Sequence, residues 1–352
     1  MKICILGDTH FGARGDSPHF HTYFRKFYEK VLFPYLKEHN ILDVVQLGDV
    51  FDRRKFVNFN SLSQSKDYFF NELNNNYSSW LLTGNHDTYF KNTNDVNSPD
   101  LLLGEYHNIN CVNEPLEIDF EDTKVLLMPW ICQENAQRCF NAMKTTTAQI
   151  IMGHFEIEGF EMYRGTYCDD GVKAELFDKF DMVISGHFHT RSFSGNITYT
   201  GTPYEMTWSD YGDPKGFHIF DTETRELTFI QNPYCMFYKL WYDDANASMS
   251  DVLGIDFEQY KDAMVKVIIR NKVNPVWFDM YIEKLEKVGI VDLQVVEDHL
   301  NLNLEDDSDI VNEAEDTLTI LGKYVEQLEI KADKQKLDNL LRTLYHQALS
   351  ME

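Results

Sequence analysis

Short apolar runs that end at a glycine recur through roughly the first 190 residues. Each run has the length and β-branched residues of a buried strand, and a side chain able to bind a metal follows it. The runs are Ile3–Leu6, Val44–Leu47, Trp80–Leu82, Ile150–Met152 and Met182–Ser185. Buried strands that end in glycine-led loops bring the loop residues to one rim of a sheet, where open α/β folds build their sites. The pattern therefore predicts one site assembled from five loops.

Segments with apolar residues at helical spacing separate these strands. Helices are predicted at about residues 20–37, 61–75 and 134–144. Further strands are predicted at Lys124–Met128, Ile197–Thr200 and Phe217–Phe220. Strands that alternate with helices favour a layered α/β (α+β) sandwich over an all-β fold. We expect this domain to span residues 1–232 and to end near Asn232-Pro233.

A smaller unit follows this domain. Lys266–Arg270 and Val291–Val296 are predicted strands, and Pro275–Lys287 between them is a predicted helix. Two strands around one helix form a small βαβ-like module. We therefore expect a second, αβ domain at residues 236–300.

The end of the sequence is charged and then amphipathic. Glu305–Asp316 holds seven Asp and Glu and no Lys or Arg, which is typical of a solvated linker, here placed at residues 301–316. Two amphipathic helices are predicted within residues 317–350. A two-helix unit this small cannot bury enough surface to fold alone. We expect it to dock on a partner, with docking on the preceding module as the plain alternative.

The composition narrows the class of protein. The chain is 43% hydrophobic and 14% aromatic, which allows a full-sized core, and it contains no apolar run of about 18 residues that could span a membrane. The six cysteines form no CxxC pair, and the first strand begins at Lys2, so we expect a cytoplasmic protein with reduced thiols and no signal peptide. The net charge of -25 fits two kinds of enzyme. One acts on small phosphoesters or phosphoproteins, and the other holds DNA through bound cations and a partner protein.

The polar residues after the five strands are metal ligands by type. Five of the twelve histidines lie in these loops, with aspartates and an asparagine. A lone Asp-x-His or Gly-His is common on protein surfaces, so the inference rests on the joint pattern. Imidazole, carboxylate and amide ligands without cysteine suit divalent cations such as Mn²⁺, with Mg²⁺ also open, rather than a structural zinc. Two such ions can activate a water against a phosphoester, and Asp49 is the natural candidate for a bridging carboxylate.

In order along the chain the five loops read Asp-x-His, Gly-Asp, Gly-Asn-His-Asp, Gly-His and Gly-His-x-His. This order resembles the calcineurin-like metallophosphoesterases, which implies a two-sheet sandwich flanked by helices. By position, the resemblance implies one metal held by Asp8, His10, Asp49 and His189 and another held by Asp49, Asn85, His154 and His187. It also implies that His86 is a catalytic histidine near the phosphate and that Asp87 orients it.

Three further segments resemble the Mre11/SbcD nucleases within that class. They are Gly12–Asp16, Tyr199–Pro203 and Met128–Asn135, the last similar to the small nuclease subunit of T4-like phages. The resemblance implies an Mn²⁺-dependent exonuclease and endonuclease that acts on double- and single-stranded DNA in recombination, repair and replication. It also implies a DNA-capping domain, a tail bound to a Rad50/SbcC-like coiled-coil ATPase, and a homodimer within a heterotetramer. A phage protein of this kind would work in the host cytoplasm.

Two details have alternative interpretations. Asp52 stands where eukaryotic and archaeal relatives have a second histidine, so the role of that histidine cannot be carried over. Asp52 either hydrogen-bonds His86 or a loop backbone, or simply caps its loop. The apolar residues of 61–75 and Pro99–Tyr106 either pair with a second copy, as the resemblance implies, or pack in the core.

Two other functional classes compete with a nuclease. A phosphoprotein phosphatase or cyclic-nucleotide phosphodiesterase could have the same ligand set, but it would not explain the αβ module or the amphipathic tail. A non-catalytic scaffold on a decayed site would have lost histidines, whereas this ligand set is intact. Cleavage of linear DNA and measurement of metal content would distinguish the three.

Overall fold

The computed structural model describes residues 1–163, 166–169 and 171–297. The predicted acidic linker and C-terminal helices lie outside these residues. Residues 1–296 form one compact unit. No helix among the described residues is both long and apolar enough to cross a membrane.

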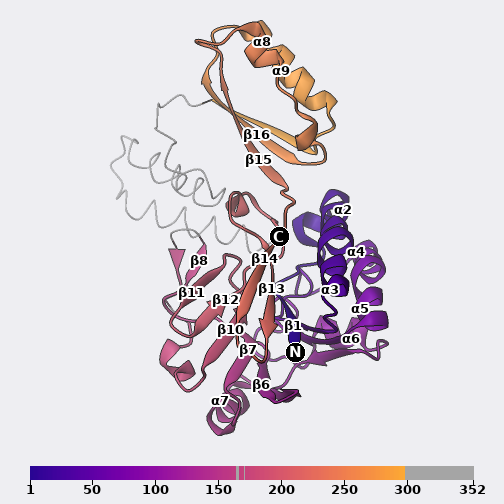
Figure 1. Cartoon of the computed structure of the whole chain (residues 1–352), viewed down its shortest axis with the longest axis vertical. Helices are drawn as coiled ribbons and strands as arrows, with labels where there is room; N and C mark the ends of the chain where they lie inside the picture. The colour runs from indigo at the N-terminus through magenta and orange to yellow at the C-terminus, as the bar shows by residue number, and fades with distance from the viewer. Residues whose placement is uncertain (164–165, 170, 298–352) are drawn as a thin grey trace, which may run out of the picture. The chain divides into compact units, whose positions relative to one another are not determined.

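Two six-stranded sheets carry the strands predicted to bear the site (Figure 1). The first sheet has the order β14-β13-β1-β2-β3-β4. Its strands are β1 (Lys2–Leu6), β2 (Asp43–Gln46), β3 (Ser78–Leu82), β4 (Ile109–Val112), β13 (Gly216–Asp221) and β14 (Leu227–Gln231). The second has the order β11-β12-β10-β7-β6-β5. Its strands are β5 (Leu116–Phe120), β6 (Thr123–Met128), β7 (Ile150–His154), β10 (Met182–Gly186), β11 (Ser192–Ser194) and β12 (Ile197–Tyr199).

Parallel pairing makes up most of both sheets. Strands β1 to β4 are parallel, with Ile5 beside Val45 and Val45 beside Trp80. Strands β6, β7, β10 and β12 are parallel as well. The carboxyl ends of parallel strands meet at one edge of their sheet, so the loops that follow them are neighbours. The predicted two-sheet α/β sandwich is confirmed.

The core between the sheets follows from alternation along the strands. In β1, Ile3 and Ile5 face the second sheet, whereas Cys4 and Leu6 face the helices. The side chains that meet Ile3 and Ile5 in this layer include Val45, Leu82, Val125, Ile150, Met152 and Ile184, all fully buried. Burial on both faces explains why these strands are continuously apolar rather than alternating.

Helices cover the outer faces of the sheets (Figure 1). The predicted helix at 20–37 is α2 (Pro18–Phe27) and α3 (Phe33–Glu38), joined by a π-helical turn at Tyr28–Leu32. The one at 61–75 is α4 (Phe59–Ser65) and α5 (Asn71–Asn76), joined by a π-helical turn at Lys66–Phe70. The remaining α-helices of this part are the short turn α1 (Ala13–Asp16), α6 (Ser98–Leu103) and α7 (Ala136–Thr145), which packs on the second sheet. Two 3₁₀ helices lie at Ala174–Phe177 and Trp208–Asp210.

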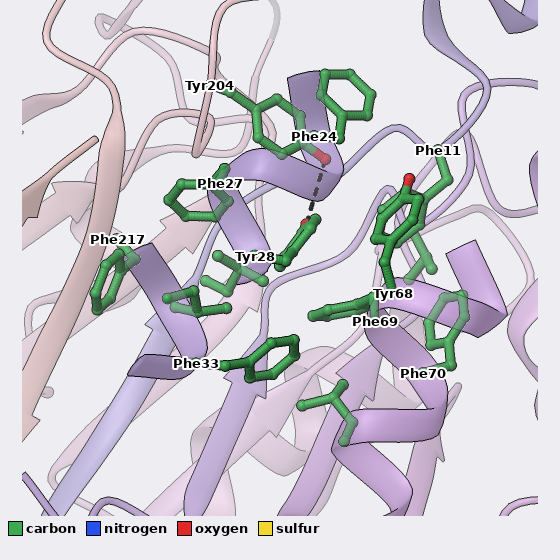
Figure 2. Packing of buried hydrophobic residues seen from close by; sticks show 14 of the residues in the cluster. Phe11, Phe24, Phe27, Tyr28, Phe33, Tyr68, Phe69, Phe70, Tyr204 and Phe217 are labelled. Carbon is green, nitrogen blue, oxygen red and sulfur yellow. Dashed lines mark hydrogen bonds between the residues drawn. The ribbon is translucent and has the colours of Figure 1, made fainter. Parts of the chain in front are cut away.

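An aromatic cluster holds the helices on the first sheet (Figure 2). The rings of Phe24 and Tyr204 stack with centroids 3.8 Å apart, and those of Tyr28 and Phe69 lie 4.5 Å apart. The hydroxyls of Tyr28 and Tyr204 are hydrogen-bonded at 3.3 Å. Tyr204 belongs to the segment that follows the last histidine motif, so the cluster connects that segment to the helices.

The αβ module has one strand more than the sequence predicted. The predicted strands and helix are present as β16 (Met264–Asn271), β17 (Asp292–Glu297) and α9 (Pro275–Lys287). The additional elements are β15 (Phe237–Asp243), which pairs in parallel with β16, and α8 (Met249–Leu253). Its sheet has the order β15-β16-β17. A two-stranded antiparallel sheet of β8 (Glu161–Tyr163) and β9 (Thr166–Tyr167) lies between β7 and β10 in the sequence.

Candidate metal centre

The structure brings all seven candidate ligands to the carboxyl ends of parallel strands. Asp8 and His10 follow β1, Asp49 follows β2, Asn85 follows β3, His154 ends β7, and His187 and His189 follow β10. Six of them form two groups whose ligand atoms all lie within 4.8 Å of one another. One group is Asp8, His10 and His189, and the other is Asp49, His154 and His187.

In the first group, two imidazole nitrogens point at each other. Nε2 of His10 lies 3.1 Å from Nε2 of His189. The Asp8 carboxylate accepts the backbone amide of His187 and lies 4.0 Å from Nε2 of His189. Two imidazole nitrogens this close need either a hydrogen bond, in which one nitrogen donates its proton to the other, or a metal ion that binds both. The group therefore has the donors and the geometry of a cation site.

The second group converges on the amide oxygen of Asn85. Oδ1 of Asn85 lies 2.8 Å from Nε2 of His154 and 2.9 Å from Nδ1 of His187. Nδ1 of His154 donates to the carbonyl of Leu47 at 2.8 Å, because a carbonyl oxygen only accepts. This bond leaves Nε2 of neutral His154 as a bare nitrogen beside another acceptor, which is how proteins orient a histidine that binds a metal.

The Asp49 carboxylate lies between the two groups. Its Oδ2 is 3.6 Å from Nε2 of His10 and 3.5 Å from Nε2 of His154. Its Oδ1 accepts the backbone amide of His86 at 2.7 Å, which fixes the carboxylate. One carboxylate oxygen therefore lies close to a histidine of each group, which is compatible with a ligand shared by both.

Backbone strain is concentrated at this centre. His10, Asp49 and His187 have φ of 41°, 51° and 85°, a region in which side chains other than glycine are uncommon. Such conformations cost about 1–3 kcal/mol each and persist where the surroundings impose them, which is frequent at functional sites. Glycines provide the room: a Cβ on Gly84 would lie 2.1 Å from the Asp49 nitrogen, and one on Gly186 would lie 2.4 Å from Oδ1 of Asp8.

The electrostatics of both groups favour bound positive charge. Burial lowers the pKa of His154, but Asp49 and Asp8 outweigh burial and raise it to about 9. Burial also lowers the pKa of His10, but Asp52 and Asp49 raise it to about 9. Burial and the neighbouring His154 lower the pKa of His187 to about 3. Burial and the neighbouring His10 lower the pKa of His189 to about 3 as well. Each group thus combines one carboxylate with one histidine held neutral, and the residues fit divalent cations.

His86 borders the groups without joining either. It lines a cavity of about 200 Å³ with His10, Asp49, Asn85 and His189. Its ring centroid is 5.0 Å from that of His10. Nδ1 donates to the backbone carbonyl of Asp52 at 2.6 Å, so Nε2 is the nitrogen left for substrate or water.

The expected contact between Asp87 and the His86 ring is not formed among the described residues. The Asp87 carboxylate instead accepts the backbone amides of Val50, Phe51 and Gly84 at 2.9–3.1 Å. Asp87 therefore shapes the loop that carries Asp49, and the Asp52 carbonyl orients His86. Asp52 also places Oδ1 3.5 Å from Nδ1 of His10, so it touches both histidines, through different atoms.

Three positioning residues were not found from the sequence. The Tyr204 hydroxyl donates to the carbonyl of Thr9 at 2.6 Å, beside Asp8 and His10. Lys215 donates to the carbonyl of His189 at 2.8 Å. Gln46 bonds both the amide and the carbonyl of Gly48 and so shapes the turn before Asp49. Gln46 had a signal, since it is the one polar residue in the apolar run Val44–Leu47, whereas the contacts of Tyr204 and Lys215 span long sequence separations.

The chain is similar in sequence to known proteins. Residues 1–191 match the family described as calcineurin-like phosphoesterase. The chain is 30% identical over 354 aligned residues to exonuclease subunit 1 of Enterobacteria phage T4, and the match covers 99% of both proteins. It is also 27% identical over 124 residues to the SbcD component of the SbcCD nuclease of Staphylococcus epidermidis, covering 32% of each. Among solved structures, a protein of unknown function from Aquifex aeolicus matches 51% of this chain and 93% of its own, at 16% identity and a TM-score of 0.28.

Proposed function

Because the chain belongs to the calcineurin-like phosphoesterase family, we propose that it is a divalent-metal-dependent DNA nuclease, the nuclease subunit of a Mre11-Rad50/SbcCD-like complex. The observation that carries the proposal is the Asp49 carboxylate, which lies between two groups of N and O donors with His86 beside them. The full-length similarity to a phage exonuclease subunit favours DNA as the substrate. The same centre without that similarity would suit any phosphoester.

Each residue then has a role at the phosphodiester. One cation would be held by Asp8, His10, Asp49 and His189, and the other by Asp49, Asn85, His154 and His187. When bound, the cations, which we propose are Mn²⁺ or Mg²⁺, supply positive charge to the phosphate and make the attacking water more acidic. Burial lowers the pKa of His86, although the charge of Asp49 opposes this, so the ring is neutral near pH 7. Nε2 of His86 is the atom that would exchange a proton at the phosphate, and the Asp52 carbonyl fixes its direction.

Basic side chains beside the centre fit a polyanionic substrate despite the net charge of -25. Arg53 and Arg54 directly follow Asp52, and Nη1 of Arg53 donates to Oδ2 of Asp16 at 3.1 Å. This bond ties the first loop, with exposed Arg14, to the loop that ends in exposed Lys55. Four cations on two joined loops could bind the phosphates that flank the cleaved one.

Hydrolysis assays with purified protein and Mn²⁺ test the proposal. The substrates are linear duplex DNA, single-stranded DNA and small phosphoesters. We expect nucleotides to be released from DNA and hydrolysis to stop with EDTA. Release of phosphate from phosphoproteins, or opening of cyclic nucleotides, without DNA cleavage would establish the alternative phosphoesterase class. No hydrolysis by the metal-loaded complex would contradict an enzymatic role.

A second copy of the chain is the proposed occupant of an apolar surface near the centre. The surface lines a cavity of about 190 Å³ between the loop after Arg54 and helix α6. Its exposed large apolar residues are Phe56 (58%), Phe59 (88%), Tyr89 (44%), Val96 (40%) and Leu101 (70%). Phe69, Phe70, Leu73 and Leu103, which the sequence also offered for pairing, are fully buried in the core. Leu101→Asp should yield monomers in sedimentation, whereas wild-type protein that is monomeric even with its partner would refute the dimer.

The predicted C-terminal helices are the proposed dock for a coiled-coil ATPase, and residues 236–300 the proposed DNA-capping domain. Purification from the native cell should recover a large coiled-coil ATPase with the chain. Truncation near Glu305 or Leu341→Asp should abolish this association and leave Mn²⁺-dependent cleavage by the remaining protein. Undiminished affinity of the truncated protein would show that the tail is not the dock. For a phage protein, the proposed site of action is the host cytoplasm, in DNA recombination, repair and replication.

A further inference from the structure

Trp130 lies beside the second ligand group of the metal centre, and no step of the proposed hydrolysis uses it. It lies two residues after β6. Its ring centroid is 5.3 Å from that of His187, with the ring planes tilted by 40°. The ring centroid of His154 is 6.0 Å away. Both histidines belong to the second ligand group, so the indole borders that group directly.

Hydrogen bonds at its backbone hold Trp130 in place. Its amide donates to the carbonyl of Thr83 at 2.8 Å, two residues before Asn85. Its carbonyl accepts the side-chain amides of Asn94 and Asn135, each at 2.9 Å. Asn135 is fully buried and also accepts the amide of Cys132. Three bonds at one residue fix the indole relative to the loop of a candidate ligand.

A small cavity lies against the half-buried indole. Its volume is about 100 Å³, and its lining includes Ile131, His154, Phe155 and Val172. On one wall a Cβ at Gly171 would come 2.6 Å from the Glu156 carbonyl, so no larger residue fits there. The indole, Ile131, Phe155 and Val172 give this recess an aromatic and aliphatic part, and His154 and Glu156 add polar groups to its lining.

We propose that Trp130 is the stacking surface for one nucleobase, that of the nucleotide adjoining the cleaved phosphodiester. The inference rests on the proposed nuclease function and specifies its substrate. Every base has a π face, so an indole holds any base without reading its identity, as an enzyme that degrades DNA of any sequence requires. A base reaches the indole only after it leaves its own base pair. The bound substrate is therefore DNA whose nucleotide beside the cut is unpaired, in a single strand or an opened end.

Cleavage of oligonucleotides that contain one abasic nucleotide, by the full-length protein with Mn²⁺, tests the stacking directly. One oligonucleotide is intact, and two others lack the base on either side of the cleaved bond. We expect one abasic position to lower kcat/KM by about 10-fold or more, the size of one base–aromatic stack. Trp130→Ala should lower cleavage of the intact strand by a similar factor and be insensitive to that abasic position, because the two changes remove the same contact. Trp130→Phe should restore most of the rate.

A binding measurement complements the kinetics. In EDTA, 2-aminopurine at the sensitive position should be quenched by wild-type protein and not by Trp130→Ala. Phe140→Ala, a change at an exposed aromatic residue of α7, should leave both measurements at wild-type values. Equal cleavage of intact and abasic strands by wild-type protein would overturn the stacking role while leaving the nuclease intact. If the losses of kcat/KM from Trp130→Ala and from the abasic site multiply, the two changes act independently, and Trp130 only positions the His187 ring. If wild-type protein cleaves no DNA, the proposed function itself fails.

Discussion

Replacing Lys215 by methionine removes a buried charge that anchors a candidate metal loop. The Lys215 side chain is 3% exposed, and Nζ lies 2.8 Å from Oδ1 of Asp210, from Oδ2 of Asp213 and from the carbonyl of His189. Methionine preserves most of the stem but leaves two carboxylates without their counter-ion. Removing one partner of a buried ion pair typically costs about 3–5 kcal/mol. We expect the variant to lose that much free energy of unfolding. It should also bind the cation of the first ligand group more weakly, because the His189 carbonyl loses its hydrogen-bond donor.

Urea unfolding followed by circular dichroism at pH 7 measures the stability, and calorimetric titration with Mn²⁺ measures the affinity. Lys179→Met is the matched control, since Nζ of exposed Lys179 donates to the carbonyls of Met143 and Thr146 but pairs with no buried carboxylate among the described residues. A surface change of this kind is expected to stay within about 0.5 kcal/mol. A loss from Lys215→Met no larger than that of the control would refute the anchoring role.

Three further predictions concern catalysis, DNA binding and pH. His86→Ala should keep both cations yet lower DNA hydrolysis by about 10²–10⁴-fold, since a positioned acid or base contributes that much, and wild-type turnover would exclude the assignment. The double variant Arg14→Glu, Lys55→Glu should weaken DNA binding and reduce the slope of log K against log salt by about 2. The control double variant Lys30→Glu, Lys37→Glu, on α3 and the turn before it, should leave the affinity and the slope unchanged. An unaltered slope in the first variant would show that these loops do not contact DNA. Burial raises the pKa of Glu205 from 4.5 to about 7, although the amides of Met236 and Phe237 donate to its carboxylate. Because folding raises this pKa, ionisation of Glu205 should cost the wild-type protein about 3 kcal/mol of unfolding free energy as pH rises from 4.5 to 7. Glu205→Gln should remove this contribution, so the stabilities of the two proteins should differ by a pH-dependent amount of that size, and parallel stability curves would show that Glu205 does not titrate in this range.

The sequence predicted the strands and the candidate ligands at the sheet edge better than the hydrogen bonds that position those ligands. Val44 to Leu47 could be assigned as a strand because burial on both faces makes it apolar apart from Gln46, and the polar Asp49 then had to lie beyond its end. Phe237–Asp243 escaped assignment because apolar, charged and aromatic side chains mix within it. Parallel pairing with β16 makes this segment a strand, although its sequence has no clear strand pattern.

Side-chain direction is what local sequence could not supply. Asp87 follows His86 directly, which suggested that they interact, yet it bonds the amides of Val50, Phe51 and Gly84. Adjacent residues on a tight turn point in different directions, so neighbours in sequence need not touch. The left-handed backbone at His10 and Asp49 was equally hidden, because it results from the meeting of loops and not from local propensity.

Counting the metal ions per chain, together with DNA hydrolysis, tests the central claim most directly. Wild-type protein and Asp49→Ala would be loaded with Mn²⁺, and bound ions counted by native mass spectrometry. The proposed centre predicts two ions per wild-type chain with DNA hydrolysis, and at most one ion with no hydrolysis in Asp49→Ala, because its carboxylate lies between the two groups. Two ions retained by Asp49→Ala, or full DNA hydrolysis by a wild-type chain that binds only one, would contradict the shared-carboxylate centre.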